Sequence, residues 1–359
     1  MKTELELNEM ILEISNKIRK NCPELLAHLD EMPLTVPYIE NPEMVTATLT
    51  TYYDSLVDLF KKNNDKNAKN KLDIPIETVA IPEIKTMKLD NAYQNLIIEV
   101  NDISLSYIDV GIGVVPIIFL HGFPFDKTTW HGQMDNLKST NRVIAIDIRG
   151  FGQSKDEKTP LTIDLFAADL FAFMDKLKIE KAIICGLSMG GYIALNAVNK
   201  FPERFAALIL CDTQCIADTI EVKENRHKNI EKIKDSDANE FNENFIKSVF
   251  YPDSLVTKTE IVEHLRNTVF ANSKEIIMAG LTALAERNET CSGLNKISIP
   301  TLIICGSDDK LTPLAQSEFM HKNITKSKLK IIDNAGHVSN LEQPEAFNNF
   351  LTNFLNSLK

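Results

Sequence analysis

Hydrophobic positions follow two different patterns along the chain, and the change comes near residue 95. In residues 1–60, apolar side chains recur every three or four positions, as at Leu7, Ile11 and Ile14, which predicts amphipathic helices. Beyond residue 95, short unbroken apolar runs alternate with helical patterns. Unbroken runs are typical of strands buried on both faces. The alternation predicts an α/β fold, in which helices cover both faces of a parallel sheet.

The strands and helices of the second region can be placed from this pattern. A two-stranded hairpin is expected first, followed by buried strands that alternate with helices. The expected strands are 95–101, 103–109, 115–120, 142–146, 182–185, 205–211, 301–305 and 329–332. The expected helices are 129–137, 163–177, 192–200 and 344–358.

One long stretch interrupts the strand rhythm. Residues 217–294 have a helical pattern with Glu- and Lys-rich faces and contain no strand-like run. We therefore expect a helical cap at 215–297, inserted between core segments 94–214 and 298–359 and lying above the strand ends, where such sheets bind ligands. The alternative is a helical surface layer that does not control access to a site.

The N-terminal segment is predicted to be separate from this core. Residues 1–60 carry 11 acidic and 4 basic residues, a net charge of −7. Residues 61–72 are almost free of apolar side chains and predict a solvated linker, and the tether continues to residue 93. We expect the N-terminal helices to pack on the main domain or on a second copy in a homodimer. Docking of another partner or a regulatory role is the alternative.

Overall composition narrows the classes of partner. The net charge is −11 and the pI is about 5.2, which argues against nucleic acid and anionic membranes as partners, since both favour basic patches. No apolar run approaches the roughly 20 residues of a membrane span, and no secretory signal is visible at the N-terminus. Six cysteines are scattered without metal-site spacing, and Cys185, Cys211 and Cys305 fall in strand-like runs as small core residues. A reducing, cytoplasmic location is predicted.

The candidate chemistry centres on a Gly-x-Ser-x-Gly sequence around Ser188. The apolar run 182–185 leads into it and the helical pattern 192–200 follows, which is the strand–turn–helix context of a nucleophile elbow. A chance match in an ordinary turn is the alternative. The chain has only 13 glycines, so their concentration at a few short motifs favours the elbow. Eight of them lie in these motifs: Gly122, Gly150, Gly152, Gly186, Gly190, Gly191, Gly306 and Gly336.

A serine nucleophile needs a base and an acid that orients the base. His337 follows the last predicted strand, and Asp308 and Asp309 follow the strand before it. This gives the order Ser…Asp…His expected for such a sheet. Backbone N–H groups of Met189 and Phe123 are the expected oxyanion donors. His121 precedes Phe123, and we expect it to brace this loop rather than act as a base.

These residues together resemble the α/β-hydrolase family, and most closely its compact bacterial carboxylesterases and enol-lactonases. The resemblance covers about residues 95–359 and implies a mostly parallel, mainly eight-stranded sheet. It implies Ser188 as nucleophile, Asp309 as acid and His337 as base, with Asp212 as the reserve acid. The residues that carry it are His121-Gly122-Phe123-Pro124, Asp147-x-Arg149-Gly150-x-Gly152-x-Ser154, Gly186-Leu187-Ser188-Met189-Gly190-Gly191, Gly306-x-x-Asp309-x-x-x-Pro313 and Gly336-His337.

The expected function is that of a serine hydrolase, without cofactor or metal, acting on a small-molecule carboxylic ester or lactone. A serine at the elbow excludes family members that use an aspartate there, such as haloalkane dehalogenases and epoxide hydrolases. The same triad also serves perhydrolysis, hydrolysis of carbon–carbon bonds and acyl transfer, and these alternatives stay open. A further alternative is a small-molecule sensor built on the same fold.

Overall fold

The structure is a computed structural model that describes residues 57, 93–156 and 160–358. The chain divides into two compact units, Met1–Lys88 and Leu89–Lys359. Apart from Val57, the helices and linker predicted before residue 93 lie outside the described residues. Among the described residues no helix is long and apolar enough to cross a membrane.

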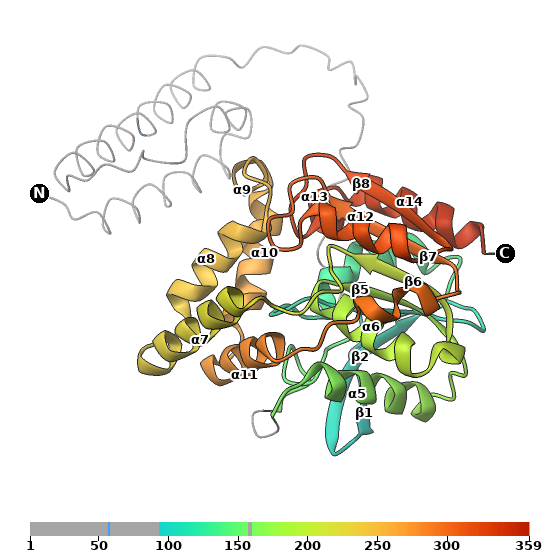
Figure 1. Ribbon diagram of the computed structural model, residues 1–359, viewed down its shortest axis with the longest axis horizontal. Coiled ribbons are helices and arrows are strands. Elements are labelled where there is room, and N and C mark those ends of the chain that lie inside the picture. The colour runs from blue at the N-terminus through green and yellow to red at the C-terminus, as the bar shows by residue number, and fades with distance from the viewer. Residues whose placement is uncertain (1–56, 58–92, 157–159, 359) are drawn as a thin grey trace, which may run out of the picture. The chain divides into compact units, whose positions relative to one another are not determined.

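The second unit is built on one eight-stranded sheet with the order β1-β2-β4-β3-β5-β6-β7-β8 (Figure 1). Strand β2 pairs antiparallel with β1 and β4, and all remaining pairs are parallel. The predicted α/β fold and the opening hairpin are therefore confirmed. The strands are β1 (Leu96–Val100), β2 (Ile103–Val110), β3 (Ile117–Leu120), β4 (Val143–Ile146), β5 (Ala182–Leu187), β6 (Phe205–Cys211), β7 (Thr301–Gly306) and β8 (Ser327–Ile332).

Two apolar cores lie on opposite faces of this sheet. Strand side chains alternate between faces, so Ile118 and Leu120 of β3 enter one core while Ile117 and Phe119 enter the other. Both cores are apolar, which explains why the central strands have unbroken apolar sequences. Helices α5 (Ile163–Lys176), α6 (Met189–Lys200) and α12 (Leu314–Asn323) cover the first face, and α4 (His131–Leu137) and α14 (Pro344–Asn356) cover the second.

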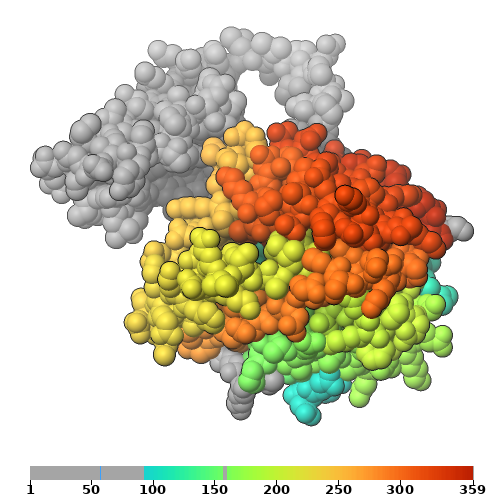
Figure 2. All heavy atoms as spheres, viewed as in Figure 1, coloured from blue at the N-terminus to red at the C-terminus, as the bar shows by residue number. Residues whose placement is uncertain are grey.

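Between β6 and β7 the chain forms a group of helices that we call the cap, residues 220–285. In Figure 1 these helices lie together beyond one edge of the sheet region, and in Figure 2 their yellow and orange atoms form a continuous lobe. Within the cap, α7 packs on α11 and α8 packs on α10. Its helices are α7 (Ile220–Asp235), α8 (Asn239–Val249), α9 (Ser254–Thr257), α10 (Thr259–Phe270) and α11 (Lys274–Ala285).

Short elements connect these parts. Each lies between a strand and a helix along the chain. They are the 3₁₀ helices η2 (Lys127–Trp130), η3 (Pro202–Arg204) and η4 (Cys291–Lys296), and the short helix α13 (Ser339–Glu342).

A disulfide bond joins Cys215 and Cys291, one on each side of the cap. The prediction of reduced cysteines is therefore wrong for this pair, whereas Cys185, Cys211 and Cys305 are free and buried as predicted. A separation of 76 positions gives no local signal of pairing, because only the folded chain brings the two Cα atoms to 4.9 Å. The cytoplasmic location stays a prediction.

Candidate active site

Ser188 lies in a strained turn between β5 and α6. Its φ of 53° and ψ of −114° are unfavourable for a residue with a side chain, and such strain is concentrated at functional sites. The flanking glycines make the turn feasible. A Cβ on Gly186 would lie 2.3 Å from the carbonyl of Gly190, and one on Gly190 would lie 2.2 Å from the Leu120 carbonyl oxygen. The local sequence therefore dictates an elbow that presents Ser188 at the N-terminus of α6.

The structure brings together the three residues predicted to share the chemistry. His337 Nε2 lies 2.7 Å from Ser188 Oγ, and His337 Nδ1 lies 2.8 Å from Asp309 Oδ2. Asp309 comes from the loop after β7 and His337 from the loop after β8, so three strand ends meet at one edge of the sheet. All three residues are buried, with Ser188 the most exposed at 9%. One imidazole therefore links a hydroxyl to a carboxylate, as proton transfer from serine requires.

Electrostatics within this group favour the ion pair that forms when His337 is protonated. Burial opposes ionisation of Asp309, but the charge and hydrogen bond of His337 and the hydrogen bonds from Thr312 outweigh it and lower the Asp309 pKa. Burial likewise lowers the pKa of His337, yet the charge and hydrogen bond of Asp309 outweigh it, so the pKa lies above its ordinary value. Asp309 Oδ2 also accepts a hydrogen bond from Thr312 Oγ1 at 2.6 Å, and Oδ1 accepts from the backbone N–H groups of Leu311 and Thr312.

The other two acid candidates lie elsewhere. Asp212 follows β6 and is fully buried, but its Oδ1 accepts from Gly306 N at 2.7 Å and its Oδ2 accepts from Ser339 Oγ at 2.5 Å. Burial and the nearby charge of Asp309 raise the pKa of Asp212 to about 8. Asp308 is exposed and accepts a hydrogen bond from the Ser307 hydroxyl. Asp309 is therefore the acid hydrogen-bonded to His337.

The loop after β3 runs directly against the elbow. A Cβ on Gly122 would lie 3.2 Å from Ser188 Cβ, which fits a loop that contacts the nucleophile. Among the described residues, neither Phe123 N nor Met189 N donates a hydrogen bond to the protein, so both N–H groups are available to a ligand. His121 braces this loop as predicted: its Nε2 accepts from Ile148 N at 2.9 Å, and its Nδ1 lies 2.8 Å from the carbonyl oxygen of Gly122.

A cavity of about 750 Å³ opens above Ser188 and His337, between the core and the cap. Its volume is in the range of pockets that enclose small organic ligands. Helix α8 contributes the apolar side chains Phe241 and Phe245, while α7 contributes Asn225 and Asn229. The cavity lining therefore combines apolar side chains with side chains that can form hydrogen bonds.

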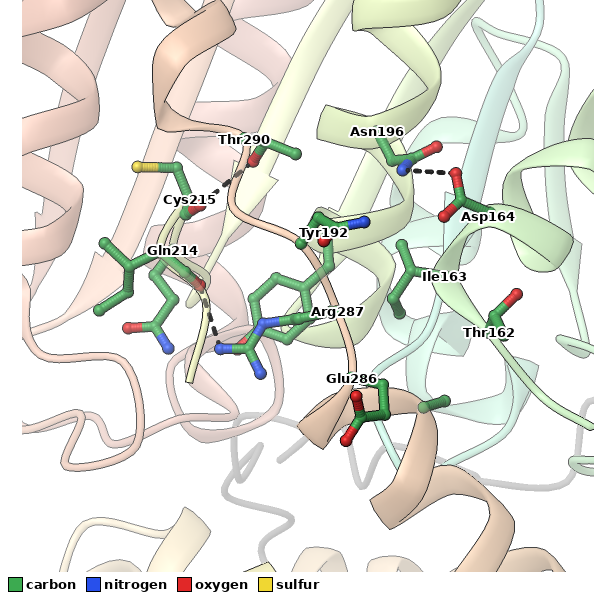
Figure 3. Close-up of a pocket in the computed structure, with 13 residues that line it drawn as sticks. Thr162, Ile163, Asp164, Tyr192, Asn196, Gln214, Cys215, Glu286, Arg287 and Thr290 are labelled. Carbon is green, nitrogen blue, oxygen red and sulfur yellow. Dashed lines mark hydrogen bonds between the residues drawn. The ribbon is translucent and has the colours of Figure 1, made fainter. Parts of the chain in front are cut away.

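A second, smaller cavity of about 110 Å³ lies at the base of the cap (Figure 3). It shares Tyr192, Gln214 and Ile216 with the large cavity, so these side chains form a partition. The Arg287 guanidinium lies 4.4 Å from the centre of the Tyr192 ring and pairs with Asp218 at 2.6 Å. Arg287 thereby fixes the Tyr192 side of the large cavity.

Among the described residues, one group of side chains has atoms close enough to bind a metal ion: the ligand atoms of Asp212, Cys305 and Asp309 lie within 4.8 Å of one another. Their existing contacts do not suit that role. Asp309 is occupied by His337 and Thr312, and Asp212 by Gly306 and Ser339. Burial raises the pKa of the Cys305 thiol, whereas metal binding needs a thiolate. The hydrogen bonds of the two aspartates and the raised pKa of Cys305 therefore do not fit a metal site.

The sequence did not predict the residues whose hydrogen bonds hold Asp309, Asp212 and the loop before His337 in place. Thr312 binds Asp309, Ser339 binds Asp212, and Glu342 accepts from Gly336 N at 2.6 Å and from Tyr251 N at 2.7 Å. Thr312 follows Asp309 by three positions, a spacing that allows a side-chain cap of a turn and could have suggested it. Ser339 and Glu342 have no comparable signal, because Asp212 and Tyr251, to which they bond, are distant in sequence.

This chain is similar to known proteins, several of which have names that describe hydrolases or esterases. Residues 115–344 match a family model described as alpha/beta hydrolase fold. The chain is 31% identical over 248 residues to 3-oxoadipate enol-lactonase 2 of Acinetobacter baylyi, covering 69% of this chain and 91% of that protein. It is 26% identical over 281 residues to 2-hydroxy-6-oxononadienedioate/2-hydroxy-6-oxononatrienedioate hydrolase of Burkholderia vietnamiensis, covering 76% and 98%.

Solved structures are similar over the same share of the chain. A thermophilic esterase from Thermogutta terrifontis matches with a TM-score of 0.70 and 32% identity, covering 74% of this chain and 99% of that one. The enol-lactonase from Burkholderia xenovorans matches with a TM-score of 0.68 and 25% identity, covering 73% and 100%.

Proposed function

Because this chain belongs to the α/β-hydrolase family, we propose that it is a serine hydrolase that cleaves a small-molecule carboxylic ester or lactone. The observation that carries the proposal is the position of His337, which lies within hydrogen-bond distance of both Ser188 Oγ and Asp309 Oδ2. The enol-lactonase and esterase names of the relatives support the same class of substrate.

In the proposed acylation step, Ser188 Oγ attacks the substrate carbonyl carbon while His337 Nε2 takes the hydroxyl proton. The carbonyl oxygen becomes negatively charged and accepts hydrogen bonds from the N–H groups of Phe123 and Met189. Asp309 holds Nδ1–H of the imidazole and stabilises the imidazolium. Collapse of the intermediate breaks the bond from the acyl carbon to the alcohol oxygen. His337 gives its proton to that oxygen and leaves an acyl-enzyme on Ser188.

Deacylation repeats these roles with water in place of serine. His337 takes a proton from the water as the water oxygen attacks the acyl carbon, and the same two N–H groups stabilise the oxyanion. The proton then returns to Ser188 Oγ as the acid leaves. A lactone follows the same course, except that alcohol and acid leave as one molecule. The large cavity above Ser188 gives space for both parts of the substrate.

Replacement of the nucleophile tests the proposal. We expect Ser188→Ala to lower hydrolysis of 4-nitrophenyl butyrate by roughly 10⁴-fold or more with an unchanged unfolding curve. A fluorophosphonate probe should label the wild-type protein at Ser188 and leave the variant unlabelled. Ser139→Ala, at an exposed position outside the cavity, is the matched control and should keep full activity. Wild-type rates in Ser188→Ala would refute the proposal.

The relatives also include a hydrolase named for a dienedioate and a protein named as a non-heme chloroperoxidase. A panel of substrates therefore has to separate ester and lactone cleavage from carbon–carbon cleavage and from perhydrolysis with hydrogen peroxide. We expect the highest kcat/KM on esters or lactones. Absence of turnover and of probe labelling would instead favour a binding protein that senses a small molecule.

A further inference from the structure

Phe123 joins the core of this protein to its cap. Its ring centre lies 5.9 Å from that of Phe151 in the core, and 6.1 and 6.4 Å from those of Phe245 and Phe241 on cap helix α8. The residue is only 4% exposed, so its ring is enclosed by aromatic groups from both parts. The backbone of the same residue passes beside Ser188 and leaves its N–H free among the described residues.

A glycine on the cap completes the enclosure of this ring. Gly280 lies in helix α11, and a Cβ at this position would be 2.4 Å from Phe123 Cε2, 2.8 Å from Phe123 Cδ2 and 3.1 Å from Phe151 Cζ. Contacts below 3.0 Å require the neighbour to move, because packed interiors have little free space. The Phe123 ring is flanked by Phe151, Phe241 and Phe245, and the residue also lines the large cavity, so a side chain at residue 280 would displace the ring from these contacts.

Gly280 is at the same time an unfavourable residue for its own helix. Glycine in a helix interior destabilises the helix relative to alanine. Its φ is not in the left-handed region, so the backbone does not require glycine. The feature that does require it is the close approach of α11 to Phe123.

We propose that Gly280 is a positioning residue, whose missing side chain lets the cap hold Phe123 so that its N–H points at the developing oxyanion. The inference rests on the proposed function, since it assigns Phe123 N as a donor in that reaction. A side chain at residue 280 would push the ring, and the ring would move the peptide that follows Gly122. The hydrogen bond to the oxyanion forms fully only in the transition state, so its loss lowers kcat and leaves substrate binding nearly unchanged.

The test is Gly280→Ala in the full-length chain. We expect kcat on 4-nitrophenyl butyrate to fall by about ten- to a hundredfold, a partial loss compared with removal of an oxyanion donor. KM should change by less than about twofold, and affinity for a trifluoromethyl ketone, which forms an oxyanion on Ser188, should fall in parallel with kcat. The unfolding midpoint should be unchanged or higher, since alanine favours the helix. Thr282→Ala, at an exposed position of the same helix, is the matched control and should behave as wild type.

A second comparison separates this role from simple packing. In a Phe123→Leu background the smaller side chain leaves room at residue 280, so adding Gly280→Ala should cost less than about threefold in kcat. The same comparison keeps the test usable if Gly280→Ala alone folds poorly. An equal loss of kcat in both backgrounds would overturn the proposal, and so would a raised KM with unchanged kcat. Failure of the proposed function itself would show differently, as activity retained in Ser188→Ala.

Discussion

The ends of strands β6 and β7, which lie side by side in the sheet, each place a buried aspartate near His337. The environments of the two carboxyls differ. Asp309 after β7 bonds to His337 and Thr312, and these contacts outweigh burial and lower its pKa. Asp212 after β6 bonds to Gly306 N and Ser339, and burial with the charge of Asp309 raises its pKa to about 8.

This difference shows how two neighbouring carboxyls at one site can have different protonation states. Two carboxylates this close do not ionise together readily, so the one with a cationic partner ionises and the other stays protonated at neutral pH. The position of each aspartate, after β7 or after β6, determines which side chains its carboxyl contacts and therefore its protonation state. Asp309 then orients and stabilises His337, and Asp212 connects the loops after β7 and β8.

The largest effect that this comparison predicts is that of Asp309→Asn. We expect kcat to fall by about 10⁴-fold, because the amide no longer favours the His337 tautomer with its proton on Nδ1 and no longer stabilises the imidazolium. Steady-state kinetics with 4-nitrophenyl butyrate measures the loss, and circular dichroism checks the fold. If Asp212→Asn caused a loss of this size and Asp309→Asn did not, the two strand ends would have the opposite roles.

The second prediction concerns the disulfide bond of Cys215, a residue in the segment that follows β6. Cys215 lies three residues after Asp212, and its disulfide to Cys291 closes the cap into a loop of 76 positions. Closing a loop of this length restricts the unfolded chain and is expected to contribute about 4 kcal/mol. The double variant Cys215→Ser/Cys291→Ser should therefore lose roughly that free energy of unfolding in urea.

Reductant provides the control for this prediction. Dithiothreitol should lower the unfolding midpoint of the wild-type protein and leave the double variant unchanged, because the remaining cysteines of the described residues, Cys185, Cys211 and Cys305, are already free. An equal response of both proteins, or none in either, would contradict a stabilising bond. Wild-type protein should also yield two additional thiols on denaturation after reduction, compared with denaturation alone.

The residues around Ser188 show how much of the fold and of the site the sequence can predict. The Gly-x-Ser-x-Gly sequence and the unbroken apolar runs follow from local rules, and the order of the strand ends adds the base, so the sheet, Ser188 and His337 could be predicted from the sequence. The choice between Asp309 and Asp212 needed resemblance to a family, since both follow strands. The bond from Cys215 to Cys291 and the contact of Gly280 with Phe123 depend on segments distant in sequence, and no local pattern encodes them.

The third prediction is the pH dependence of activity. His337 must be neutral to accept the Ser188 proton, so kcat/KM should rise about tenfold per pH unit on the acid side and level off above the pKa of His337. Because Asp309 holds that pKa above its ordinary value, the plateau should begin at a higher pH than for a free imidazole. Removing the charge in Asp309→Asn should move the residual acid limb to lower pH. If the acid side of the kcat/KM profile of Asp309→Asn stayed at the same pH, Asp309 would not be the group that raises the pKa of His337.

The smallest effect is expected for Asp212→Asn at neutral pH. An amide resembles a protonated carboxyl: its Oδ1 can accept from Gly306 N, and its Nδ2 can donate to Ser339 Oγ. We therefore expect kcat to stay within about threefold of wild type, since Gly306 N and Ser339 Oγ each keep a hydrogen bond to this side chain. Asp212→Ala is the contrasting variant, because it leaves the Gly306 N–H without its acceptor and should destabilise the protein by about 1–3 kcal/mol.

The protonation state of Asp212 can be tested by comparing the free energy of unfolding of Asp212→Asn and of the wild type as a function of pH. The folded pKa of about 8 lies above the value of 3.8 expected when unfolded, so this carboxyl favours the unfolded state increasingly as pH rises between those values. The Asn side chain does not ionise, so the variant lacks this pH-dependent destabilisation. Its free energy of unfolding relative to wild type should rise from pH 4 to pH 8 and then level off, as measured by urea titration at each pH. A variant that became relatively less stable over this interval would show that Asp212 is ionised in the folded protein.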